Sequence, residues 1–205
     1  MFLLKHSIAA LFLALVFSIA NPLPAAAQSA PTTSLAGRLL VASPSIGDPR
    51  FHKTVILMVR HDKDGAFGLV VNRPIGEQPL ARLLERFGEK ETTASGETPI
   101  FFGGPVQPEL GFVLHSSDYR RDETIDIDGQ VAMTSTREVL RDIGNSQGPK
   151  QVLIAFGYSG WGPGQLEGEL KRSSWSLAAA DAKLIFEIDR DKVWELAYSQ
   201  RQQDL

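Results

Sequence analysis

Short apolar runs separated by turn-forming residues characterise the first half of the chain. The runs are rich in Val, Ile and Leu and are bounded by Pro, Gly or Asp, which is a pattern typical of strands. They predict strands at residues 39–42, 54–59, 67–71, 100–102 and 111–114. The turn signal Asp62-Lys63-Asp64-Gly65 predicts a hairpin between the second and third strands. Asp128-Gly129 predicts another hairpin, between residues 124–127 and 131–133.

From about residue 80 onward the chain mixes strand and helix patterns. Apolar residues three and four positions apart predict a helix at residues 80–87 that Gly88 ends, and the charged residues 89–98 predict a flexible loop. Ser135 and Glu138 have the spacing of a capping box at the start of a second helix. Further helices are expected at 166–170 and, after an Asp189 cap, at 191–201, with strands at 152–156 and 183–188. Because strands come first and mixed elements later, the order predicts a single compact domain of the α+β class.

The N-terminus has the three parts of a secretory signal peptide in order. Lys5 and His6 precede an apolar run at residues 7–19, and Ala25-Ala26-Ala27 provides the small residues of a cleavage site. The run is shorter than the roughly 20 apolar residues that a membrane-spanning helix needs. The sequence therefore predicts a signal peptide at 1–27 cut between Ala27 and Gln28, a flexible leader at 28–35 and a folded domain at 36–205. The expected location is periplasmic or secreted, with no stable membrane span after cleavage.

Composition removes several classes of function. The chain has no cysteine, so disulfides and thiolate chemistry are excluded. It has 21 basic and 24 acidic residues and a net charge of −3; an acidic domain without clustered basic residues does not predict nucleic-acid binding. No catalytic set, metal site or cofactor is predicted. His61 and His115 could share a metal or proton-transfer site, but no histidine spacing of a known metal motif supports it.

The glycine-rich stretch at residues 157–164 is the most informative segment for chemistry. It follows a buried-type strand and precedes a helix, and in such a turn backbone N–H groups can converge on an anion. The alternative is a tight turn in which Trp161 fills the core. Gly157 and Ser159 also begin a G-x-S-x-G pattern, but Trp161 stands where the final glycine of a hydrolase nucleophile elbow is required.

Two other turns join this stretch as candidate ligand-binding segments. Arg73 can bind a carboxylate or phosphate in a bidentate fork. The alternative is a loop in which Asn72 bonds the backbone and Arg73 pairs with a nearby acidic residue. The complete set of predicted ligand-binding residues is Asn72, Arg73, Gly103, Gly104, His115, Gly157, Gly160, Trp161, Gly162 and Gly164.

Five spaced blocks together resemble one bacterial family. They are residues 35–44 (LAGRLLVASP), 48–55 around Asp48-Pro49-Arg50-Phe51, 65–74 (GAFGLVVNRP), 103–106 with Leu114-His115, and 157–167 (GYSGWGPGQLE). In this order they are similar to the AlgH/YqgE family, over residue 35 to the C-terminus. The resemblance implies a compact α+β fold with a bent, barrel-like mixed sheet flanked by helices, and it carries no agreed activity, cofactor or catalytic residue. The predicted signal peptide is a departure from that family.

Three functional hypotheses follow. The first, which we favour, is an exported, non-catalytic binding module for a small anionic ligand or a protein partner, built on the glycine-rich turns. The second is a hydrolase that uses Ser159 with His61 or His115. The third is a cytoplasmic transcriptional regulator of exopolysaccharide genes, which only the family resemblance implies.

Overall fold

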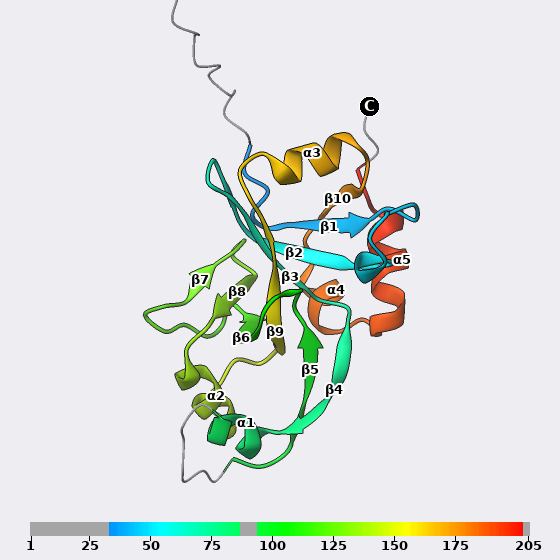
Figure 1. The fold of residues 1–205 in the computed structure, drawn as a ribbon. Helices are drawn as coiled ribbons and strands as arrows, with labels where there is room; N and C mark the ends of the chain where they lie inside the picture. Colours follow the sequence, from blue (N-terminus) through cyan, green and yellow to red (C-terminus); the bar gives the residue numbers. More distant parts are fainter. Residues whose placement is uncertain (1–32, 87–93, 203–205) are drawn as a thin grey trace, which may run out of the picture. The chain divides into compact units, whose positions relative to one another are not determined.

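A computed structural model describes residues 33–86 and 94–202, and a strongly curled β-sheet is its central feature (Figure 1). The strand order is β10-β1-β2-β3-β9-β6-β8-β7, with a β4–β5 arm attached to β9. All pairings between the described strands are antiparallel except that of β5 with β9. The sheet forms a curled half-barrel with helices packed around it. This confirms the predicted α+β class and the bent, barrel-like mixed sheet.

The strands in chain order are β1 Arg38–Ala42, β2 Val55–Asp62, β3 Gly65–Val70, β4 Pro74–Pro79, β5 Glu97–Phe102, β6 Val106–Ser116, β7 Ile125–Asp126, β8 Val131–Thr134, β9 Val152–Trp161 and β10 Trp175–Ala179. The helices within the described residues are η1 Pro49–Phe51, a 3-10 helix, and α1 Leu80–Arg86, α2 Arg137–Gly144, α3 Gln165–Lys171, α4 Ala182–Phe186 and α5 Arg190–Ser199.

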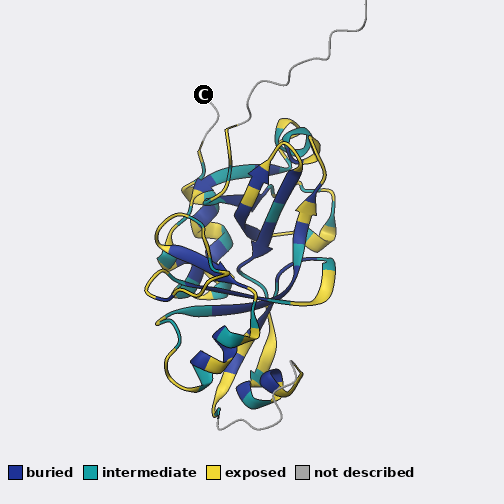
Figure 2. Ribbon diagram, turned by 90° about the vertical axis from the view of Figure 1, so that its left-hand side faces the viewer, coloured by how far each residue is buried: buried dark blue, intermediate teal, exposed yellow. Residues whose placement is uncertain are grey.

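Three apolar clusters hold these elements together, and their buried side chains lie mainly on the strands (Figure 2). The largest fills the concave side of the sheet, where α4 and α5 also pack. A second lies between the β5–β6–β9 region and the pair α1 and α2. The third lies under α3, where Trp161 and Trp175 pack against the outer face of β1–β3. Within the described residues, no helix is both long and apolar enough to span a membrane.

Four expectations need correction. Residues 182–186 form α4 rather than a strand, because the Asp181 side chain accepts from the Lys183 N–H at 2.8 Å and caps a helix. The glycine-rich segment continues β9 to Trp161, so the turn is limited to the residues just before α3. Thr136, not Ser135, is the N-cap residue of α2. Residues 89–93 of the loop expected at 89–98 lie outside the described residues. The last two positions of that loop, 97 and 98, belong to β5.

Two strands lacked a recognisable sequence signal. β4 begins and ends with proline, which is tolerated because β5 is the one described strand that bonds to it. β10 follows α3 and pairs with β1 in register from Arg38–Ala179 to Ala42–Trp175.

Candidate functional site

A large open hollow lies on the curled sheet. It has a volume of about 560 Å³ and is formed by β2, β3, β6 and β9. Its lining residues are Arg60, Ala66, Phe67, Val106, Gln107, Leu110, Phe112, Tyr158, Gly160 and Trp161. We call this hollow the aromatic cleft. Barrel mouths and clefts of roughly 300–1,000 Å³ are the usual places for small-ligand binding.

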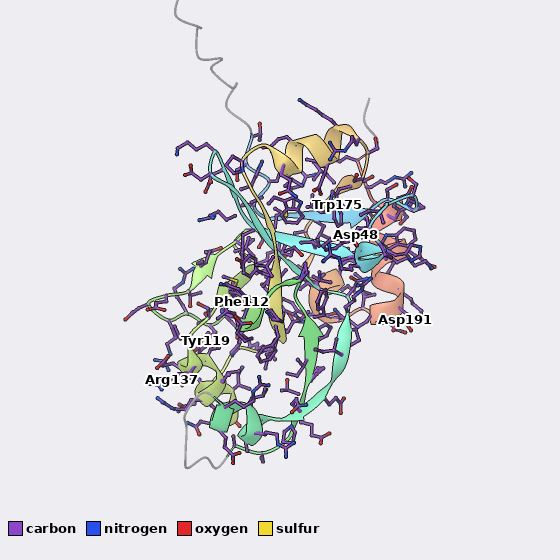
Figure 3. All side chains as sticks on the ribbon, viewed as in Figure 1. Asp48, Phe112, Tyr119, Arg137, Trp175 and Asp191 are labelled. Carbon is purple, nitrogen blue, oxygen red and sulfur yellow. The ribbon has the colours of Figure 1, made fainter. Side chains whose placement is uncertain are left out.

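Three aromatic rings pack against one another along one wall of the aromatic cleft. Phe67 lies 5.4 Å from Phe112 and 4.9 Å from Tyr158, measured between ring centroids. Phe112 and Tyr158 meet edge to face at 6.1 Å. Phe112 lies near the middle of the sheet (Figure 3) and belongs to the first apolar cluster. The three rings come from β3, β6 and β9, so hydrogen bonding of the sheet fixes their relative positions and presents a preformed apolar surface.

Trp161 forms another part of the lining, and a carboxylate on α3 orients it. The Glu169 Oε2 atom accepts from the Trp161 indole N–H at 3.0 Å and from the Trp175 indole N–H at 2.8 Å. Gln165 donates to the other carboxylate oxygen at 3.0 Å. The two indole rings also meet edge to face at 6.2 Å. Trp175 lies towards α3 in Figure 3. Glu169 therefore fixes the orientation of the Trp161 ring, which is buried in the third apolar cluster, while the residue also contributes to the lining of the aromatic cleft.

Gly160 lies beside the Tyr158 ring in this lining. A Cβ atom at Gly160 would lie 3.0 Å from the Tyr158 Cε2 atom, so a larger residue would push the ring. Gly162 lies outside the aromatic cleft, and a Cβ atom there would meet no described atom within 4 Å. The next glycine, Gly164, has a φ of +74° and is the N-cap residue of α3.

The remaining glycines of the predicted set hold two backbone segments in close contact. A Cβ atom at Gly103 would lie 2.2 Å from the Gly157 carbonyl oxygen, and one at Gly104 would lie 2.1 Å from the Tyr158 carbonyl carbon. A Cβ atom at Gly157 would lie 2.3 Å from the Gly104 carbonyl oxygen. Only glycine allows this crossing of β9 by the β5–β6 connection. Because Tyr158 lies at this crossing, the crossing fixes the backbone position of a residue that lines the aromatic cleft.

Arg60 gives the aromatic cleft its charge. Among the described residues that line the cleft, Arg60 is the charged one and none is acidic. Its Nε atom lies 3.5 Å from a carboxylate oxygen of Asp62, and the two side chains are 65% and 43% exposed. Such an exposed pair contributes about 0–1 kcal/mol. An anion in the aromatic cleft could therefore replace Asp62 as the partner of Arg60 at little cost.

Asn72 and Arg73 follow the C-terminal end of β3, whereas the cleft residues Ala66 and Phe67 are at its N-terminal end. There the two side chains form hydrogen bonds to the backbone of a loop. Asn72 accepts from the Val55 N–H and donates to the Lys53 carbonyl, each at 2.9 Å. The Arg73 guanidinium donates to the carbonyl oxygens of Arg50 and His52. Burial lowers the pKa of Arg73. The contacts of Asn72 match the alternative in which it bonds the backbone, whereas Arg73 bonds backbone carbonyl oxygens rather than the expected acidic side chain.

His115 is buried at the end of β6 and belongs to a different network. Its Nδ1 donates to the Ser116 carbonyl at 2.9 Å, so its Nε2 accepts from the Thr134 hydroxyl at 2.9 Å. Burial lowers the pKa of His115 below its usual range. Next to it, Asp142 accepts from the Tyr119 hydroxyl at 2.6 Å and from Arg121. Burial first, and then the bond to Asp142, raises the pKa of Tyr119.

His61 and His115 do not form one site. The β-ladders place His61 level with Ala66 and Trp161, and His115 level with Val152, which is the other end of β9. His61 accepts from the Leu35 N–H at 3.1 Å, so its Nε2 donates to Glu167 at 3.0 Å. These bonds attach α3 and residue 35 to β2.

Ser159 is separate from both imidazoles. It is 1% exposed, and its hydroxyl has no hydrogen-bond partner among the described residues. Both ring nitrogens of His61 and of His115 are already bonded elsewhere. Within the part of the chain that the structure describes, no group of three or more His, Asp or Glu side chains is placed to hold a metal ion. The geometry thus offers an apolar, cationic recess, and it does not bring Ser159 together with either histidine.

Several residues of the aromatic cleft were not predicted from the sequence. Arg60 ends an apolar run, and Phe67 and Phe112 have the pattern of ordinary strand residues. Glu169 lies eight positions after Trp161 and six before Trp175, a spacing that no motif indicates. Of the ten predicted residues, Gly160 and Trp161 line the aromatic cleft.

Comparisons with known proteins agree on one family. The model of the family described as AlgH-like matches residues 39–205. A UPF0301 protein of Rhodospirillum rubrum is 44% identical over 153 residues, which is 75% of this chain and 80% of that protein. A UPF0301 protein of Methylococcus capsulatus is 46% identical over 161 residues, 78% of this chain and 88% of that protein.

Two solved structures are similar to this fold. The solution structure of the AlgH protein from Pseudomonas aeruginosa has a TM-score of 0.72 and 38% identity and covers 84% of this chain and 91% of that one. The crystal structure of protein DIP2367 from Corynebacterium diphtheriae has a TM-score of 0.56 at 20% identity, covering 77% and 82% of the two chains. The second likeness concerns the fold alone.

Proposed function

The chain belongs to the AlgH-like family, and for this member we propose a non-catalytic binding function: the aromatic cleft binds a small anionic ligand that has an apolar body. The observation that carries the proposal is the pairing of a preformed aromatic wall with a single exposed cation. Phe67, Phe112 and Tyr158 provide the wall and Arg60 the cation.

The chemistry of the lining favours this class of ligand over a neutral or cationic one. Apolar and aromatic surface supplies affinity through the water it releases, and one charged group sets the orientation of the ligand. Arg60 can donate two parallel hydrogen bonds to a carboxylate or phosphate. The Gln107 side chain also borders the cleft and offers a further polar contact.

Calorimetric titration with 3-phenylpropanoate tests this function, because the probe combines one ring with one carboxylate. Arg60→Gln is expected to weaken binding at least roughly tenfold, since a hydrogen bond to a charged group contributes about 1.5–3 kcal/mol. Arg137→Gln is a matched control, because Arg137 pairs with Glu138 at 3.6 Å on the surface of α2 and is 53% exposed. Absence of binding, or equal effects of the two substitutions, would contradict the proposal.

A second pair of variants tests the wall of the cleft. Gly160→Ala presses on the Tyr158 ring, whereas Gly162→Ala meets nothing within 4 Å among the described residues. We expect Gly160→Ala to weaken binding of the probe and Gly162→Ala to leave the affinity unchanged. Equal affinities in both variants would place the binding site elsewhere.

We also propose that this binding module is exported. The support is the order of basic, apolar and small residues at 1–27, together with a family match that begins only at residue 39. Mass spectrometry of the protein from fractionated native cells tests the proposal. A chain that begins at Gln28 outside the cytoplasm is expected, and a full-length chain confined to the cytoplasm would contradict it.

A further inference from the structure

A second hollow adjoins the aromatic cleft and has a different character. It has a volume of about 330 Å³ and is lined by Val59, Arg60, Phe67, Ile125 and Met133. Arg60 and Phe67 line both hollows, so the two meet at these side chains. Apart from Arg60, every side chain that lines the second hollow is apolar.

The curl of the sheet creates this second hollow. Val59 and Arg60 belong to β2 and Phe67 to β3, whereas Ile125 and Met133 belong to β7 and β8, at the far end of the strand order. The hollow therefore lies where the β8–β7 end of the sheet approaches β2 and β3. Val59 and Met133 are buried at its base. Methionine adapts its shape easily, which suits a surface that receives flexible apolar groups.

Exposed apolar side chains border both hollows. Among the described residues, the large hydrophobic side chains with high exposure are Ile75, Leu110, Ile125 and Leu196. Leu110, 43% exposed, borders the aromatic cleft, and Ile125, 47% exposed, borders the second hollow. Apolar side chains therefore line both hollows, from Leu110 past Phe67 to Ile125, and Arg60 lies where the two hollows meet.

This arrangement points to a particular ligand: we propose that the binding site takes an anionic amphiphile with a single unbranched hydrocarbon chain. Its acidic group pairs with Arg60, and its chain passes over Phe67 into the second hollow, against Ile125 and Met133. The proposal rests on the function proposed for the aromatic cleft and adds the class of ligand. A compact aromatic acid fills the aromatic cleft alone, whereas an unbranched chain also fills the second hollow.

Titration of the wild-type protein with hexanoate, octanoate and decanoate, below their micellar concentrations, tests the proposal. Transfer of a CH₂ group out of water is worth about 0.8 kcal/mol, so each added CH₂ that enters the hollow should lower Kd by roughly two- to fourfold. Ile125→Glu places a carboxylate at the second hollow and should abolish this dependence on chain length. Ile75→Glu is the matched control, because Ile75 is 63% exposed on β4 and lines neither hollow.

The outcomes separate the two proposals. If 3-phenylpropanoate binds but Kd does not change with chain length, the amphiphile proposal is overturned and the binding function stands. The same holds if Ile125→Glu and Ile75→Glu show equal dependence on chain length. If neither 3-phenylpropanoate nor the unbranched acids bind, both proposals are overturned.

Discussion

Glu169 offers the sharpest test of how the site is held together. Its Oε2 atom accepts from the indole N–H groups of Trp161 and Trp175 at 3.0 and 2.8 Å. Both rings are buried. Glu169→Ala removes the acceptor and leaves two donors without their partner. Each hydrogen bond to a charged group contributes about 1.5–3 kcal/mol, and water can reach the half-buried carboxylate position, so we expect a loss of about 2–4 kcal/mol in the free energy of unfolding.

Denaturant unfolding followed by circular dichroism measures this loss directly, and a fall of the melting temperature on the order of 10 °C should accompany it. Glu169→Gln retains one carbonyl oxygen and should lose about half as much. Glu195→Ala removes an exposed carboxylate on α5 and serves as the control for loss of a surface charge. If Glu169→Ala unfolds within about 0.5 kcal/mol of the wild type and of Glu195→Ala, the carboxylate does not hold the two rings and the reasoning is refuted.

The remaining predictions concern backbone fit, loop attachment and pH. Gly104 has a φ of +155°, and a Cβ atom there would lie 2.1 Å from the backbone. Gly104→Ala should therefore lower the free energy of unfolding by more than about 3 kcal/mol. In the same denaturant titration, Gly162→Ala should change it by less than about 0.5 kcal/mol. Asn72→Ala should cost about 1–3 kcal/mol because the Val55 N–H loses its acceptor, and unchanged stability would contradict the loop contact. Burial lowers the pKa of His115 in the folded state, so the imidazole takes up its proton at a higher pH in the unfolded chain than in the folded one. The free energy of unfolding should therefore be constant above about pH 6.5 and decrease as the pH drops below it. That fall should disappear in His115→Gln, and an identical pH profile for the variant and the wild type would refute the assignment.

Local patterns predicted the elements that local interactions determine. The β2–β3 hairpin follows from two apolar runs around a turn signal, and the central place of β9 follows from a run that is apolar on both faces. Asp189 caps α5, as its position before the apolar residues indicates. In each case the residues that decide the structure are close together in the chain.

Non-local packing explains what the sequence left unassigned. The glycines at 157–164 indicated a turn, but Gly157 serves a close crossing with Gly104, which lies roughly fifty positions earlier. The aromatic cleft exists because the sheet curls and brings β3, β6 and β9 around one recess. No local feature of the sequence marks Arg60 as a candidate binding residue, because the cleft that it lines is formed together with residues of other strands. Three of the six predicted glycines, Gly103, Gly104 and Gly157, therefore allow the backbone crossing beside the aromatic cleft and do not line it.

The most direct test of the central claim uses the three tryptophans as reporters of binding. In a ¹⁵N-labelled sample each indole N–H gives a separate signal: Trp161 lines the aromatic cleft, Trp175 shares Glu169 with it, and Trp194 donates to the Ala42 carbonyl beside α5. On titration with decanoate we expect the Trp161 signal to shift most, Trp175 to shift less and Trp194 to stay in place. Saturable binding that shifts Trp194 and leaves Trp161 unchanged, or no shift of any indole signal, would contradict a ligand site in the aromatic cleft.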